Sequence, residues 1–179
     1  MSSHGTKAFA DVHALRASFD QHFAAPQQIA TTGLEKFVII SIGANRFAIR
    51  VSEIARIEVN RKVVPLPRSA PALLGLAGIR GKLVPVYSLA VLLGEAPGRT
   101  TRWLALSSSE EPLGLAFDNL EQFVEVAGSA VCAVTESVKA GRYVPFVLRM
   151  GTASFGVVSL PSILTSINAS AGRAPGKER

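Results

Sequence analysis

The segment 75–89 holds the residues whose types and spacing best suit the binding of another molecule. Gly75, Gly78 and Gly81 surround a single charged residue, Arg80, and an apolar run that contains Pro85 follows at once. Glycine permits a positive φ and the close approach of another chain, so we expect tight turns around the arginine. An arginine held in this way offers a planar fork of donors at a fixed position. The pattern predicts recognition of a partner surface, or else a guanidinium that only ties its own loop together.

Residues for catalysis or metal binding are missing or badly spaced. His4, His13 and His22 are nine apart, so on a helix successive rings point to opposite sides and do not form a metal site. The rest of the chain has no histidine to activate a nucleophile. Lys82 is followed by a leucine, so the glycines do not form a phosphate-binding loop. We therefore expect no enzyme activity, no metal and no cofactor.

Composition is typical of a folded protein in a reducing compartment. The 179 residues are enough for one domain, or for two very small ones, and 48% are hydrophobic and 18% charged. The longest apolar runs are too short to span a bilayer, and the N-terminus lacks the pattern of a signal peptide. Cys132 is the only cysteine and has no partner in the chain for a disulfide. The sequence therefore predicts a cytoplasmic protein without membrane insertion.

The net charge of +6, with a pI of about 10.0, has three interpretations. The first is that the chain binds nucleic acid, and the second is that it works beside an acidic partner or an anionic membrane face. The third is that its solvated surface is simply basic. Basic residues are scattered, and Trp103 and Tyr143 are too few to form a stacking platform. A basic β-barrel that binds nucleic acid through its Arg and Lys side chains is thus the alternative function.

The elements that position Arg80 are mostly short strands. Residues 1–32 form an extension whose apolar stripe, at spacings of three and four, predicts an amphipathic helix that packs on the domain or docks on a partner. Residues 33–167 show short strands about ten residues apart, which favours small antiparallel barrels with a boundary near 94–100. Short helical turns are expected at Ser52–Ile54, Ser88–Leu93 and Pro161–Ile167. Residues 168–179 read as a flexible basic tail.

The two halves of the domain resemble each other weakly. Residues 113–118 echo residues 45–50, each a turn that leads into a strand, and residues 144–147 echo residues 83–86 around a proline. Two barrels built on one plan account for these echoes. Proline within a strand places that strand at an edge or a bend.

The run from Lys36 to about Ile167 resembles the CheW-like domain, the adaptor of bacterial chemosensory arrays. Phe37–Ile42 and residues 47–49 resemble the opening hairpin of the family. Leu74–Leu89 is close to its pattern of Gly, hydrophobic residues, Arg-Gly and then Pro-Val, and Leu113–Asp118 resembles a later strand.

This resemblance implies a mainly β fold of two five-stranded antiparallel barrels around a groove. It also implies a non-enzymatic adaptor that couples the cytoplasmic tip of a chemoreceptor to the regulatory domain of a CheA-type histidine kinase, in an array beside the membrane. Residues that match receptor-binding positions, or replace them, are Ile54, Arg56, Gly75, Arg80 and Gly81. Arg50 and Asp118 are further candidates for contact with a partner.

The chain departs from the family pattern by losing negative charge. Arg56 and Arg50 replace acidic residues, Ser88 and Ser159 stand where the family has Asp, and Gln122 replaces another acidic residue. Arg56 and Arg80 would then repel each other, although Glu58 points the same way as Arg56 along the strand and is a candidate counter-ion. Because charge swaps at a rim change the choice of partner, we expect an adaptor with retuned specificity.

Overall fold

The computed structural model describes residues 33–67, 69–96, 98, 101–134 and 141–171. The amphipathic helix expected within 1–32 and most of the expected basic tail lie outside these residues. The elements along the chain are β1 (Leu34–Ile42), β2 (Asn45–Arg50), η1 (Val51–Glu53), β3 (Ile54–Val59), β4 (Val63–Val64), β5 (Leu73–Ile79), β6 (Lys82–Ser88), α2 (Leu89–Leu93), β7 (Trp103–Ser107), β8 (Gly114–Phe117), β9 (Asn119–Ala127), η2 (Gly128–Ala130), β10 (Val131–Ala133), β11 (Phe146–Met150), β12 (Ala153–Val158) and α3 (Leu160–Ala171).

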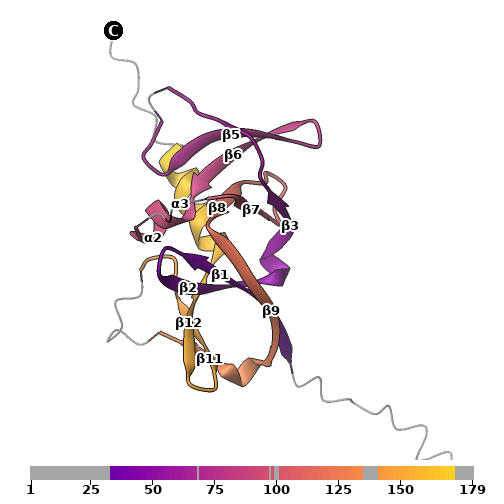
Figure 1. Ribbon diagram of the computed structural model, residues 1–179, viewed down its shortest axis with the longest axis vertical. Helices are drawn as coiled ribbons and strands as arrows, with labels where there is room; N and C mark the ends of the chain where they lie inside the picture. The colour runs from indigo at the N-terminus through magenta and orange to yellow at the C-terminus, as the bar shows by residue number, and fades with distance from the viewer. Residues whose placement is uncertain (1–32, 68, 97, 99–100, 135–140, 172–179) are drawn as a thin grey trace, which may run out of the picture. The chain divides into compact units, whose positions relative to one another are not determined.

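The described strands form two sheets of six strands each (Figure 1). Sheet A has the order β10-β11-β12-β2-β1-β9, and sheet B has the order β3-β7-β8-β6-β5-β4. The predicted mainly β architecture is confirmed, with six strands in a sheet where five were expected.

The two sheets do not follow one another along the chain, so a boundary at 94–100 does not separate them. Hairpin β1–β2 joins β9–β12 in sheet A, whereas hairpin β7–β8 joins β3–β6 in sheet B. Each half of the chain thus gives its first hairpin to one sheet and its next four strands to the other. The parallel pairs β2–β12 and β6–β8 occupy equivalent places. The echo between residues 45–50 and 113–118 therefore falls on equivalent strands, while the proline echo does not.

Three apolar clusters fill this architecture. Phe37 and Ile39 lie in a cluster on one face of sheet A, and Ala77 and Val84 lie in a cluster on one face of sheet B. The opposite faces of both sheets share a middle core with α2 and α3, which contains Val38, Leu115, Leu89 and Ile163 among others. Because β1 and β8 are buried on both faces, their sequences read as continuous apolar runs without alternation.

Two local expectations need correction. Pro85 lies inside β6, which has neighbours on both sides in sheet B and is not an edge strand. Pairing of β6 with β8 begins only at Val86, so the missing N–H of Pro85 faces a locally unpaired side.

The closing helix is also longer than expected, since α3 continues through Asn168 to Ala171. None of the helices among the described residues is long and apolar enough to cross a membrane.

Candidate functional site

Arg80 lies at the exposed tip of the β5–β6 hairpin. Ile79 pairs with Lys82, so Arg80 and Gly81 are the two central residues of the turn, with φ of 49° and 76°. Positive φ at both central residues defines the type I′ turn that matches the twist of a hairpin. In the part of the chain that the structure describes, the guanidinium of Arg80 makes no ion pair or hydrogen bond. Its donors are therefore available to a partner.

The backbone of Arg80 is in a conformation that a side chain disfavours. A left-handed residue other than glycine or asparagine costs about 1 kcal/mol, because its Cβ crowds the following carbonyl. The equivalent hairpin in sheet A is β11–β12, where Met150 pairs with Ala153. Its first turn residue is Gly151, with φ of 58°. The hairpin of sheet B thus places an arginine where its counterpart uses glycine, and such strain is often found at functional sites.

An apolar surface extends from this hairpin over the outer face of β4, β5 and β6. Val64 pairs with Leu76, and Leu76 with Pro85, so the three side chains form one row across the sheet. Leu83 is 73% exposed and Val64 is 54% exposed. We call the surface formed by Val64, Leu74, Leu76, Leu83 and Pro85 the hairpin face. Exposed apolar side chains gathered on one face are typical of a surface that binds another protein.

The neighbouring glycines shape the hairpin rather than surround Arg80 with turns. Gly75 is buried at a bulge in β5 with φ of 143°, and a Cβ there would collide with the carbonyl of Val64. Gly78 lies in the regular part of β5, opposite Leu83, and only Gly81 belongs to the turn itself. The expectation of turns on both sides of Arg80 is therefore wrong for the N-terminal side, and Gly75 influences partners only through the backbone it permits.

Ile54 and Arg56 lie on β3, which is the edge strand of sheet B beside β7. Arg56 Nη1 lies 3.4 Å from Glu58 Oε1, while Arg61 Nη2 lies 2.7 Å from Glu58 Oε2. The hydrogen bond from Arg61 lowers the pKa of Glu58, as does the weaker bond from Arg56. The side chain of Arg56 retains 28% exposure. Glu58 thus pairs with Arg56 and Arg61, and no ion pair with Arg80 occurs among the described residues.

We call Ile54, Arg56, Glu58 and Arg61 the β3 cluster. Among the described residues, Arg80 makes no ion pair or hydrogen bond with this cluster. β3 lies at one end of the order of sheet B, with β7, β8 and β6 between it and β5. The candidate receptor-binding residues therefore divide between the β3 cluster and the hairpin.

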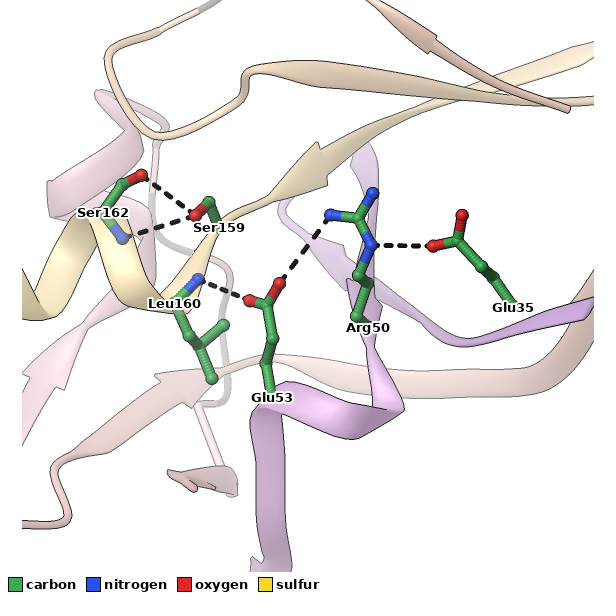
Figure 2. Close-up of polar contacts among 6 residues, drawn as sticks. All are labelled: Glu35, Arg50, Glu53, Ser159, Leu160 and Ser162. Atoms are coloured by element: carbon green, nitrogen blue, oxygen red, sulfur yellow. Dashed lines mark hydrogen bonds and ion pairs between the residues drawn. The ribbon is translucent and has the colours of Figure 1, made fainter. Parts of the chain in front are cut away.

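Arg50 makes several contacts within the domain and keeps 21% of its side chain exposed, and its contact with a partner stays a prediction. Figure 2 shows its guanidinium between Glu35 and Glu53, with Nε donating to Glu35 Oε2 at 2.8 Å and Nη1 lying 3.7 Å from Glu53 Oε1. The guanidinium carbon is also 4.9 Å from the ring centre of Phe146. Glu53 in turn accepts a hydrogen bond of 2.8 Å from the backbone N–H of Leu160, at the start of α3. The guanidinium of Arg50 thus makes its contacts within the domain. It links β2 to Glu35 of β1 and, through Glu53, to the start of α3.

Asp118 is buried, with 5% exposure, and its carboxylate is fully used inside the domain. The backbone N–H of Gly43 donates to Oδ2 at 2.7 Å, and the hydroxyl of Thr101 donates to Oδ1 at 3.0 Å. Asp118 therefore stabilises the β1–β2 turn, in place of the contact with a partner that we expected.

Two of the departures from the family pattern act as helix caps. The hydroxyl of Ser88 accepts from the N–H of Val91 at 3.3 Å at the start of α2. The hydroxyl of Ser159 accepts from the N–H of Ser162 at 3.3 Å at the start of α3 (Figure 2). Ser and Asp are comparable N-caps, so these two replacements of an acidic residue preserve a structural function. The surface charge changes that remain are Arg56 and Gln122.

The hairpin face is a site that the sequence pattern did not reveal. Leu83 and Val64 lie within apolar runs, and in such runs alternation does not tell which side chains are exposed. Only the fold shows that Leu83, opposite Gly78, and Val64 keep more than half of their surface exposed. No cluster of residues that could hold a metal ion occurs in the described parts of the chain.

Comparison with known proteins assigns the chain to a family. The family model described as CheW-like domain matches residues 36–167. The chain belongs to the CheW-like domain family. A solved structure, the scaffolding protein TtCheW from Thermoanaerobacter tengcongensis, superimposes with a TM-score of 0.67 at 15% identity, over 81% of this chain and 97% of that one. A search of curated proteins gives no match.

In this CheW-like domain the hairpin, the hairpin face and the β3 cluster are the candidate binding surfaces. The Arg-Gly pair that carries the resemblance occupies the exposed turn of the hairpin. Ser88 and Asp118 are buried, and Arg50 and Ser159 are partly buried and make contacts within the domain.

Proposed function

We propose that this protein is a non-enzymatic adaptor that couples the cytoplasmic tip of a chemoreceptor to a CheA-type histidine kinase. The observation that carries the proposal is Arg80, which lies at an exposed hairpin tip of a CheW-like domain in a strained conformation and has no ion pair among the described residues. The guanidinium binds a carboxylate of the partner, and the hairpin face supplies apolar contact. We place the adaptor in the cytoplasm, beside membrane-bound receptors and without insertion into the membrane.

The β3 cluster supports a partner choice that differs from that of other members. Arg56 keeps part of its side chain exposed beside Ile54, and Glu58 divides its carboxylate between Arg56 and Arg61. A partner with a carboxylate at this position gains an ion pair, whereas a partner with a cation there is repelled. Retuned specificity therefore depends on Arg56 and Gln122, and not on the internal positions.

The test is binding of the full chain to a receptor tip fragment and to the regulatory domain of the kinase. In Arg80→Asn the turn keeps a residue that tolerates positive φ, while the guanidinium is lost. We expect this variant to bind at least one partner about tenfold more weakly, since hydrogen bonds to charged groups contribute roughly 1.5–3 kcal/mol. Arg149→Gln removes an exposed arginine from β11 and is the matched control, with expected binding close to wild type.

Two results would contradict the proposal. Wild-type affinity of Arg80→Asn for both partners would show that the hairpin tip does not contact them. Equal binding of the protein to every CheA-type kinase of the same cell would leave the adaptor function in place but remove the retuned specificity.

A further inference from the structure

A groove separates β6 from α3 on the outer side of sheet B. It has a volume of ≈ 420 Å³ and is bounded by β6, by the connection between β7 and β8, and by the second half of α3. It opens at the side of β6 where Pro85 has no strand partner toward β8. Its lining consists of Lys82, Leu83, Val84, Pro85, Tyr87, Glu110, Glu111, Pro112, Leu113, Leu164, Ile167 and Asn168.

One wall of the groove is a ridge of α3. Leu164, Ile167 and Asn168 are spaced by three and four residues, so their side chains lie in one row on the helix. Leu164 and Ile167 are only partly buried in the domain, and Asn168 is exposed. A ridge of this kind receives the side chains of a second helix packed alongside it. Leu83, on the facing strand, offers that helix further apolar contact.

The opposite wall carries two carboxylates, Glu110 and Glu111, on a turn held in place by hydrogen bonds. The hydroxyl of Ser107 accepts from the N–H of Leu113 at 3.0 Å, and the hydroxyl of Ser109 donates to the carbonyl of Glu111 at 2.7 Å. Neither carboxylate makes an ion pair within the described residues. Lys82 is the only cation in the lining, so the groove is a local acidic site on a chain of net charge +6.

From this arrangement we infer that the groove binds an amphipathic helix of a partner protein that carries Lys or Arg beside its apolar stripe. The stripe packs against Leu83, Leu164 and Ile167, and the basic residues pair with Glu110 and Glu111. Burial raises the pKa of Tyr87, which keeps its phenol protonated and able to donate a hydrogen bond. The groove shares Leu83 and Pro85 with the hairpin face, but its carboxylates select cations, whereas Arg80 selects carboxylates. The inference does not depend on the proposed adaptor function.

The test uses the full chain and two synthetic probes. The first is an 18-residue helical peptide with leucine at positions i, i+3, i+4 and i+7 and lysine on either side of this stripe. The second has glutamate in place of every lysine. We expect fluorescence anisotropy to show binding of the lysine peptide at least about fivefold tighter than binding of the glutamate peptide, since 1 kcal/mol of ion pairing corresponds to that ratio.

Two variants at exposed positions locate the binding. Glu111→Lys should weaken binding of the lysine peptide by about fivefold or more, whereas the matched control Glu125→Lys, on β9, should change it less than about twofold. Asn168→Arg places bulk and positive charge in the groove and should also weaken binding. Failure of both peptides to bind, equal binding of the two, or equal effects of Glu111→Lys and Glu125→Lys would overturn the inference.

Discussion

Arg80 combines an unfavourable backbone conformation with an exposed side chain that has no ion pair among the described residues, and the effects of the two on stability and on binding are separable. Its φ of 49° suits asparagine or glycine, as Gly151 shows in the equivalent turn. Asn-Gly is the preferred pair for a type I′ turn. We therefore expect Arg80→Asn to raise the free energy of unfolding by about 0.5–1 kcal/mol, even as it weakens partner binding. Urea denaturation of the two proteins measures this, and a loss of stability would mean that the guanidinium holds its own loop together.

Glu53 couples the stability of the domain to pH. Desolvation by burial raises the pKa of its carboxyl above 4.5, and outweighs the opposing contacts from the N–H of Leu160 and from Arg50. The folded chain then holds a proton at a pH where the unfolded chain has lost it. The stability contributed by protonation of Glu53 is therefore fully present below the unfolded pKa and falls as pH rises through the raised one.

The variant Glu53→Gln isolates this effect, because the amide stays neutral and its oxygen still accepts from Leu160. We expect the free energy of unfolding of wild type, minus that of the variant, to decline as pH rises above the ordinary pKa of 4.5 and through the raised pKa of Glu53. Urea denaturation at a series of pH values checks the sign. A difference that grows with pH would show that the ion pair with Arg50 outweighs burial.

At the scale of elements, the β5–β6 hairpin depends on a bulge that only glycine allows. Gly75 has φ of 143°, and an added Cβ would meet the backbone of β4 at Val64. We expect Gly75→Ala to lower the free energy of unfolding by about 2–4 kcal/mol, because both backbone strands would have to shift.

Gly78 provides the matched control in the same strand. Nothing lies within 4 Å of a Cβ there, so Gly78→Ala should change stability by less than about 0.5 kcal/mol. Thermal unfolding of the two variants compares them directly. Similar losses for both would mean that the bulge is not the reason for glycine at position 75.

Helix α3 depends on a distant element as well as on its own cap. Ser159 caps it locally, whereas Glu53 reaches the N–H of Leu160 from η1, across 107 positions of sequence. The cap is recognisable in a sequence, because Ser followed by a helical apolar pattern is a common start signal. The contribution of Glu53 is not, since it exists only when sheet A and the β2–β3 connection are in place.

At the scale of the whole molecule, each sheet needs both halves of the chain. A fragment 34–96 contains β1 and β2 without their partners β9 and β12, and contains β3 to β6 without β7 and β8. We expect this fragment and the fragment 97–179 each to be unfolded alone, and their mixture to recover the fold. Isolated strand pairs lack the buried area that a stable sheet requires.

Circular dichroism and amide NMR dispersion measure this complementation. A cooperative unfolding transition in either fragment alone would show that the halves fold as separate units, as a boundary at 94–100 would require.

The sequence by itself determined the features that depend on neighbours along the chain. Alternation and apolar runs predicted most strands, and the surrounding motif predicted the CheW-like family, which the family match confirms. The glycines around Arg80 predicted turns on both sides of it, and only the turn at Gly81 is present. Local sterics and side-chain periodicity decide these features, so they are readable without a fold. The alternation along β3 likewise predicted that Glu58 lies on the same side of the strand as Arg56, and the two side chains form an ion pair.

Only the tertiary structure decided which strands share a sheet and which charges are free. The bond between Gly43 and Asp118 spans 75 positions, and the contacts of Arg50 join β1, η1 and the ring of Phe146. The fold decides whether a side chain takes part in such a long-range contact or stays exposed to solvent, and a single sequence holds no local signal for either outcome. For that reason Arg50 and Asp118 resembled contacts with a partner in the sequence, whereas the hairpin face and the groove beside α3 emerged from the fold.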